Sequence, residues 1–229
     1  MTVQVENSLR DPSVRGVLAR LRQDAGRDAW RFIGLAPRIL VEMLRGRSLS
    51  EAMTPESARN IYMPVSPEQG EFIYLLARSL GATRVVEFGT SFAISTIYLA
   101  AAVRDNGGGV VIGSELEPSK HVRAVANLKE AGLDDVAEVR LGDALQTLRE
   151  LPEPLDLVLL DGWKELYLPV LELVKPRLRK GAVVLADNIF TFRKSLRPYV
   201  EHMQSGANGF ESTTLRISDG FELSVYLGQ

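Results

Sequence analysis

Two short apolar runs that each stop at oxygen-rich residues constrain the fold more than any other feature of this sequence. The run 155–160, LDLVLL, has Leu or Val at five of its six positions and ends at Asp161. An unbroken apolar run of this length is typical of a strand buried on both faces of a parallel sheet. The run 181–186, GAVVLA, ends in the same way at Asp187 and Asn188. Because ligands bind beyond the carboxyl ends of such strands, these three side chains should meet at one rim of the sheet.

Oxygen ligands gathered at one rim predict a site for a hard divalent cation. Carboxylate and amide oxygens suit Mg²⁺, Mn²⁺ or Ca²⁺ much better than zinc. Asp161 is followed by a glycine, a tryptophan and Lys164, so an aromatic ring and a cation should lie beside the rim. The alternative is that Asp187 and Asn188 only cap the next helix.

From residue 84 onward, strand patterns alternate with helical patterns. The expected strands are 84–88, 110–115, 136–141, 155–160 and 182–186. The helical patterns between them lie near 92–103, 118–131, 144–150 and 166–178. This alternation predicts right-handed βαβ units and a doubly wound α/β fold built on a parallel sheet.

The C-terminal part of the chain predicts a change of strand direction. A helix around 193–205 precedes two strands, 211–217 and 221–227, which are joined at Asp219-Gly220. Asp-Gly between β-rich runs is a strong hairpin signal. We therefore expect the sheet to end with an antiparallel strand at one side.

The N-terminal part predicts helices that must cover something. Asp11-Pro12 is a helix start, and an apolar face follows at helical spacing. Its members are Val14, Val17, Leu18 and Leu21. Residues 30–45 are also helical in pattern and strongly apolar, so they should pack on their own domain or meet a partner chain. We expect one domain, 1–229, in which 1–60 form a helical lid or a homodimer contact and 61–229 form the α/β core.

Composition excludes several classes of protein. The formal charge of −2 gives no electrostatic reason to bind nucleic acid or an anionic membrane. There is no cysteine, so neither a disulfide nor a thiolate site can form. The apolar runs are too short to span a bilayer, and the N-terminus lacks a secretory signal pattern. We therefore expect a cytoplasmic protein whose partner is neither a nucleic acid nor a membrane.

The first strand-to-helix turn points to a nucleoside ligand. Gly89 follows the strand 84–88 and lets backbone approach a ligand closely, but the full G-x-G-x-x-G pattern of NAD and FAD sites is absent. Glu115 ends the next strand, where a carboxylate would accept hydrogen bonds from both hydroxyls of a ribose. Adenosine without pyrophosphate indicates S-adenosylmethionine. The alternative is that Glu87 and Glu115 are ordinary solvated acids.

Several motifs, in the right order over 60–227, carry a family resemblance. VVEFGTSFAIS resembles motif I of the class I S-adenosylmethionine-dependent methyltransferases. LVLLDGWKELYLPVL and LRKGAVVLADN resemble catechol O-methyltransferases, and MPVSPEQGEF is similar to both the catechol and the caffeoyl-CoA types. The resemblance implies a Rossmann-like seven-stranded sheet whose last strand is antiparallel. It also implies methyl transfer to a phenolic hydroxyl of a small molecule, assisted by a divalent cation, usually Mg²⁺.

The resemblance also implies roles for individual residues. Asp161, Asp187 and Asn188 match the metal ligands, and Lys164 matches the general base. Glu115 matches the acid on the ribose. The implied cofactor surround comprises Met63, Val65, Glu87, Gly89, Ser91, Ser95, Leu116, Asp143, Ala144, Asp161 and Trp163. The chain departs from the family pattern at three positions, which hold Ala93 in place of a glycine, Gly162 in place of a histidine and Thr213 in place of an acid.

The chemistry needs these groups because the nucleophile must be an oxyanion, whereas a simple phenol has a pKa near 10. A bound cation would stabilise the anion, and a lysine with a lowered pKa could take the proton. Two alternatives remain, a metal-independent methyltransferase and a non-catalytic protein that binds S-adenosylmethionine. We expect only packing or surface roles for His121, His202, Tyr167 and Tyr199.

Overall fold

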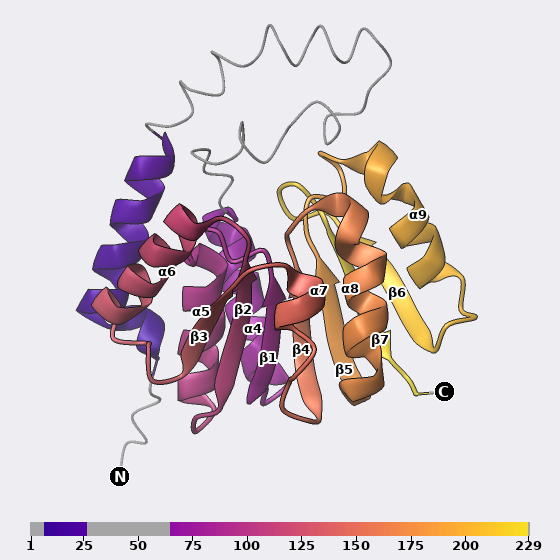
Figure 1. Ribbon diagram of the computed structural model, residues 1–229, viewed down its shortest axis with the longest axis horizontal. Coiled ribbons are helices and arrows are strands. Elements are labelled where there is room, and N and C mark those ends of the chain that lie inside the picture. Colours follow the sequence, from indigo (N-terminus) through magenta and orange to yellow (C-terminus); the bar gives the residue numbers. More distant parts are fainter. Residues whose placement is uncertain (1–6, 27–64, 229) are drawn as a thin grey trace, which may run out of the picture.

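The computed structural model describes residues 7–26 and 65–228, which fold around one seven-stranded sheet with helices on both faces (Figure 1). The strands are β1 Arg84–Phe88, β2 Val110–Glu115, β3 Ala137–Leu141, β4 Leu155–Leu160, β5 Leu178–Ala186, β6 Phe210–Leu215 and β7 Phe221–Tyr226. They lie in the order β3-β2-β1-β4-β5-β7-β6. β1 to β5 are parallel to one another, and β7 runs antiparallel to both of its neighbours. This confirms the predicted α/β fold and its antiparallel last strand.

Helices follow the strands as the alternation predicts. The α-helices are α4 Pro67–Ser79, α5 Ile94–Asp105, α6 Pro118–Glu130, α7 Ala144–Thr147, α8 Tyr167–Val174 and α9 Arg193–Gln204, and residues 12–26 are also helical. Short 3₁₀ turns lie at Ser8–Arg10, Lys164–Leu166 and Lys175–Arg177. α7 is shorter than the expected 144–150.

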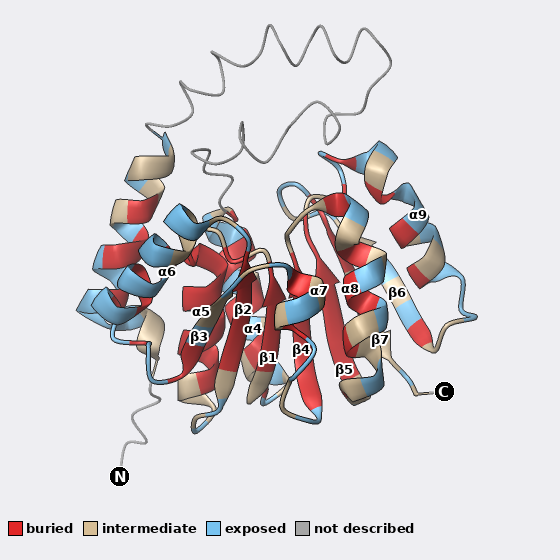
Figure 2. Cartoon of the chain, viewed as in Figure 1, coloured by how far each residue is buried: buried red, intermediate tan, exposed pale blue. Residues whose placement is uncertain are grey.

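The sheet divides the interior into two cores. Alternate residues of β4 face opposite sides: Leu157 and Leu159 join the core under α4, α5 and α6, while Val158 and Leu160 join the core under α7, α8 and α9. All residues of β4 are buried, as its unbroken apolar run predicts (Figure 2). A strand enclosed on both faces is rigid, so the residues just past its end are held in place.

The two C-terminal strands differ in detail from the expectation. The antiparallel strand β7 lies one position in from the edge, because β6 pairs along its outer side and forms the edge itself. The fifth strand also differs: β5 begins at Leu178, before the expected 182. Its first residues are mostly polar and include Gly181 at φ +79°, so the apolar pattern did not reveal them. Arg179 there binds Asp156 of β4 at 2.6 Å, which pairs the two strands through charge where apolar residues are lacking.

The first N-terminal helix packs on its own chain. Its apolar face, Val14, Val17, Leu18 and Leu21, is buried in the core beside α5 and α6. The Arg20 guanidinium donates to the side-chain oxygen of Asn127 on α6 at 2.9 Å. The stretch 30–45, expected as a lid or homodimer contact, lies outside the described residues, as does Met63. In the ranges described, no helix is both long and apolar enough to cross a bilayer.

Candidate functional site

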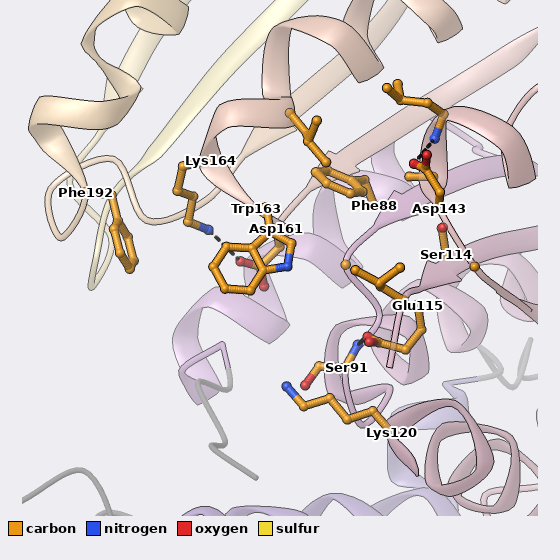
Figure 3. Close-up of a pocket in the computed structure, with 17 residues that line it drawn as sticks. Phe88, Ser91, Ser114, Glu115, Lys120, Asp143, Asp161, Trp163, Lys164 and Phe192 are labelled. Carbon is orange, nitrogen blue, oxygen red and sulfur yellow. Dashed lines mark hydrogen bonds and ion pairs between the residues drawn. The ribbon is translucent and has the colours of Figure 1, made fainter. Parts of the chain in front are cut away.

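A pocket of about 440 Å³ opens at the carboxyl ends of β1 to β4, within the size range of small-molecule sites (Figure 3). Most residues expected at the cofactor and base positions line it, namely Gly89, Ser91, Glu115, Leu116, Asp143, Ala144, Asp161, Trp163 and Lys164. Lys164 and Phe192 lie at one end of the pocket, and Ser114 and Asp143 lie at the other. Glu115 lies nearer the Ser114 end, beside Ser91.

Glu115 is a preorganised hydrogen-bond acceptor on the pocket wall. It is buried, and its two carboxylate oxygens accept the backbone N–H groups of Ser91 at 2.7 Å and Glu117 at 2.8 Å. A carboxylate can accept about four hydrogen bonds, so each oxygen can take one more from a ligand. The alternative that Glu115 is an ordinary solvated acid is therefore wrong.

Glu87 is also buried but does not line the pocket. Its carboxylate accepts hydrogen bonds from the hydroxyls of Ser95, at 2.5 Å, and Thr96. Complete burial raises the pKa of Glu87. Glu87 and Ser95 thus bond each other behind the turn at Gly89, and the buried Val65 also lies outside the pocket lining. The solvated-acid interpretation is wrong for Glu87 too.

Two glycines allow the loops after β1 and β4 to touch. Gly89 has φ +96°, and a Cβ atom added to it would lie 2.5 Å from the backbone nitrogen of Gly162. A Cβ atom on Gly162 would lie 2.4 Å from the ring of Phe88. The Phe88 ring therefore fills the space that a side chain at position 162 would need, which explains why this chain has glycine there.

The far end of the pocket is formed by the start of α7. Asp143 caps this helix, since its carboxylate accepts the backbone N–H of Leu145 at 2.9 Å. Asp143 and Ala144 line the pocket at this end, and Leu116, which follows β2, lines it as well.

The opposite end is lined by Asp161 and Lys164, whereas Asp187 and Asn188 lie next to them but outside the pocket lining. Backbone hydrogen bonds continue past the strand ends, from Asp161 N–H to Phe88 at 2.8 Å and from Asp187 N–H to Leu160 at 2.9 Å. They place the two acids on neighbouring strands. The Lys164 ammonium donates to the amide oxygen of Asn188 at 2.6 Å and lies 3.6 Å from a carboxylate oxygen of Asp161. The structure thus brings the four predicted residues together.

Asn188 has an unusual backbone. Its φ of +65° is left-handed, a conformation that non-glycine residues adopt rarely and mainly where function or packing requires it. Neither Asp187 nor Asn188 caps α9, whose N-cap residue is Phe192 and has no side-chain cap. The alternative of a simple helix cap is therefore wrong.

Burial shifts the pKa values of the ionisable groups in this cluster. Burial raises the pKa of Asp161 to about 6, and burial together with the Asp161 charge raises the pKa of Asp187 to about 8. Burial lowers the pKa of Lys164, against the opposing effect of Asp161. Lys164 pairs with Asp161, whereas the Asp187 carboxylate accepts hydrogen bonds from Gln69 and Asn188. A divalent cation would stabilise the charged form of both acids. No group of three or more His, Cys, Asp or Glu side chains is placed to hold a metal within 7–26 and 65–228, and the predicted set is two carboxylates and one amide.

Sequence reasoning missed several residues of the site. Tyr167 packs edge-on against Phe88, as expected of a core residue, but its hydroxyl also accepts from Lys164 at 2.9 Å. Lys120 and Phe192 line the pocket. The sequence of α6 has the amphipathic pattern of any surface helix, so it does not indicate that Lys120 faces a pocket.

Other expectations concern residues outside the pocket. His121 contacts the backbone oxygen of Val139 at 2.9 Å, and His202 lies on α9; neither lines the pocket. Thr213 is exposed on β6 and does not line it either. The packing role expected for Tyr199 fits its buried edge-on contact with Tyr167.

Comparisons with known proteins agree with this geometry. A family model described as a methyltransferase domain matches residues 86–189. A catechol O-methyltransferase of Mycobacterium tuberculosis is 32% identical over 195 residues, which cover 78% of this chain and 88% of that protein. The O-methyltransferase TomG of Streptomyces achromogenes, solved with S-adenosylmethionine, is 29% identical at a TM-score of 0.66, covering 72% of this chain and 82% of that one. An O-methyltransferase of Bacillus cereus, solved with S-adenosylhomocysteine, is 27% identical at a TM-score of 0.68, covering 90% of this chain and 99% of that one.

Proposed function

This chain belongs to the class I S-adenosylmethionine-dependent O-methyltransferases, and from that premise we propose that its acceptor is a small catechol-like phenol and that a divalent cation assists the reaction. The observation that carries the proposal is the cluster of buried Lys164 and Asp187 with half-buried Asp161 and Asn188, in which Asp161 and Lys164 line one end of the pocket. Clusters of acids around a lysine are typical of sites where a side chain removes a proton from a hydroxyl and nearby charges stabilise the resulting anion.

The methyl donor fits the remainder of the pocket. Glu115 would accept the ribose hydroxyls through the free lone pairs of its two oxygens. The adenine would lie between Trp163 and the wall formed by Leu116, Asp143 and Ala144. This pose directs the sulfonium methyl toward Lys164, where an acceptor hydroxyl would sit. The two related structures solved with S-adenosylmethionine or its product support the assignment.

The cation would be held by Asp161, Asp187 and Asn188. The raised pKa values of the two acids support this, because a divalent cation would stabilise the charged carboxylates that burial disfavours. When bound, Mg²⁺ or another hard cation, such as Mn²⁺ or Ca²⁺, would lower the pKa of an acceptor hydroxyl. Such cations take several oxygen ligands, which two adjacent hydroxyls of the acceptor could supply.

Lys164 supplies the base. Burial lowers the pKa of its ammonium, and a lowered pKa favours the neutral amine that a general base requires. Tyr167 and Asn188 hold its Nζ by hydrogen bonds at 2.9 and 2.6 Å. The acceptor hydroxyl gives its proton to Nζ, its oxygen forms a bond to the methyl carbon, and the carbon–sulfur bond breaks. The products are a methyl ether and S-adenosylhomocysteine, with the proton left on Lys164.

A screen of acceptors tests this proposal. Formation of S-adenosylhomocysteine would be measured with catechols, hydroxycinnamoyl thioesters and polyketide phenols, with Mg²⁺ and after EDTA treatment. We expect turnover with a vicinal diol that EDTA abolishes and Mg²⁺ restores. Turnover that EDTA leaves unchanged would point to a metal-independent transferase. Cofactor binding without turnover of any acceptor would point to a non-catalytic protein. Asp187→Asn serves as the control, because it should bind cofactor but not respond to Mg²⁺.

A further inference from the structure

Gln69 connects the start of α4 to the predicted metal site. Its side chain is only 1% exposed, and its Nε2 donates to Oδ1 of Asp187 at 2.7 Å across 118 residues of sequence. Its Oε1 accepts the backbone N–H of Ser66 at 2.9 Å, and the Gln69 N–H donates to the Ser66 hydroxyl at 3.1 Å. One buried amide thus satisfies a helix cap on one side and touches a candidate metal ligand on the other.

The orientation of this amide follows from its partners. The backbone N–H of Ser66 can only donate, so the Gln69 atom beside it must be the oxygen. The NH₂ group therefore faces Asp187, and Oδ1 of Asp187 must accept from it. The same Oδ1 accepts the backbone N–H of Asn188 at 2.6 Å. Oδ2, in contrast, meets only the Asn188 side-chain amide, at 3.2 Å, among the hydrogen bonds within the described parts of the chain.

We infer that Gln69 is a positioning residue for Asp187, which fixes Oδ1 so that Oδ2 is the oxygen presented to a divalent cation. The inference rests on the proposed function, because it assigns a role toward the same cation site. Two donors on one oxygen stop the carboxylate from rotating about its own axis, and ligands held in this way by outer partners bind metal more tightly.

Helix capping alone does not explain a glutamine at this position. A capping box accepts glutamate as readily as glutamine. A glutamate here, however, would place a second carboxylate against Asp187 in a buried site, where like charges repel strongly. Only an amide both accepts from Ser66 and donates to Asp187.

The scaffold keeps Gln69 in place. The next residue, Gly70, packs so closely on α5 that an added Cβ atom would lie 2.2 Å from the ring of Tyr98. This contact fixes the distance between α4 and α5. Gln69 therefore reaches Asp187 from a rigid element.

The test compares two variants of the full chain by isothermal titration of Mg²⁺ in the presence of saturating S-adenosylhomocysteine. Gln69→Met keeps the length and removes both polar contacts, so Mg²⁺ affinity should fall by ~10–100-fold, the usual effect of losing an outer partner of a metal ligand. Ser66→Ala removes the Ser66 hydroxyl from the cap but leaves the Gln69–Asp187 contact. It should lower Tm, as Gln69→Met also should, while Mg²⁺ affinity stays at the wild-type value. If Gln69→Met does not fold, Gln69→Asn, whose amide is too short to span both partners, tests the same contact.

The outcomes separate this inference from the proposed function. Wild-type Mg²⁺ affinity in Gln69→Met would overturn the inference alone. An equal loss of Mg²⁺ affinity in Ser66→Ala would also overturn it, because the effect would then come from capping. No Mg²⁺ binding by the unaltered chain would overturn both the inference and the metal-dependent part of the proposed function.

Discussion

The Lys164 ammonium lies 2.6 Å from the side-chain oxygen of Asn188, a contact that joins the end of β4 to the end of β5. It forms because β4 and β5 are parallel neighbours and both are enclosed on their two faces. Each strand therefore delivers its first polar residues to the same point. The predictions below follow from this arrangement and from the pocket beside it.

Glu115→Ala should weaken binding of S-adenosylhomocysteine by ~1–3 kcal/mol, because ligand hydroxyls and two backbone N–H groups would lose a buried acceptor. Calorimetric titration measures the change. Glu117→Ala is the matched control: Glu117 caps α6 only two residues away but does not line the pocket. It should lower stability and leave affinity unaltered. Equal affinity losses in the two variants would show that Glu115 does not contact the ligand.

Gly162→Ala should destabilise the protein by ~1–3 kcal/mol, since the new methyl group would press on the Phe88 ring. The double variant Gly162→Ala with Phe88→Leu should recover part of this loss, because a smaller side chain leaves room. Gly16→Ala is the control, as an added Cβ atom at Gly16 meets nothing within 4 Å. Chemical denaturation is measured for wild type, Gly162→Ala, Phe88→Leu, the double variant and the control, and strictly additive effects of the two substitutions would contradict the proposed contact.

Leu21→Ala should cost ~2–5 kcal/mol of unfolding free energy, because Leu21 is fully buried where the N-terminal helix packs on the core. Leu75→Ala on α4, where the side chain is 62% exposed, should change stability little. The loss at Leu21 should be the same at low and high protein concentration if this helix packs within its own chain. A loss that disappears as protein concentration rises would instead place the helix in a homodimer interface.

Asp187→Asn should change how stability depends on pH. Burial raises the pKa of Asp187 from 3.8 to about 8 in the folded protein, so the folded state holds a proton that the unfolded state has lost. Stability contributed by this proton is complete below about pH 4 and is lost as pH rises toward about 8. In metal-free buffer, the Tm of Asp187→Asn relative to wild type should therefore increase over this window.

At the upper end of this window, added Mg²⁺ should raise the Tm of the wild type but not that of Asp187→Asn. The cation would bind only the folded state, and the variant lacks one of the carboxylates that would hold it. Glu211→Gln, at an exposed acid on β6, keeps the candidate cation site, so its Tm should follow that of the wild type across pH and rise with Mg²⁺ in the same way. A Tm difference between Asp187→Asn and wild type that is constant across pH would refute the role given to Asp187.

Much of this molecule could be predicted from local sequence pattern. Largely apolar runs predict β1, β2, β4 and the second half of β5. The runs of β4 and β5 also predict where Asp161, Asp187 and Asn188 emerge, because the polar residues that follow each run lie at the carboxyl end of its strand. The start of β5 could not be predicted, since its first residues are polar and pair through the Arg179–Asp156 contact.

Contacts between distant segments could not be predicted either. Ser66 and Gln69 give a clear capping signal, but nothing local indicates that the Gln69 amide reaches Asp187. Similarly, Tyr167 has the pattern of a core residue, and only the fold brings its hydroxyl to Lys164. Such contacts depend on how α4 and α8 pack against the sheet, which the sequence of either helix alone does not specify.

The central claim, that Lys164 takes the proton of the acceptor, is tested most directly by kcat for Lys164→Met and wild type across phenols of falling pKa, with saturating Mg²⁺. With acceptors of high pKa, loss of a positioned base should lower kcat by ~10²–10⁴. The deficit should shrink as the acceptor pKa falls below the assay pH, because an acceptor that is already ionised needs no base. A deficit that stays constant down the series would contradict the claim and show that Lys164 only positions the substrate.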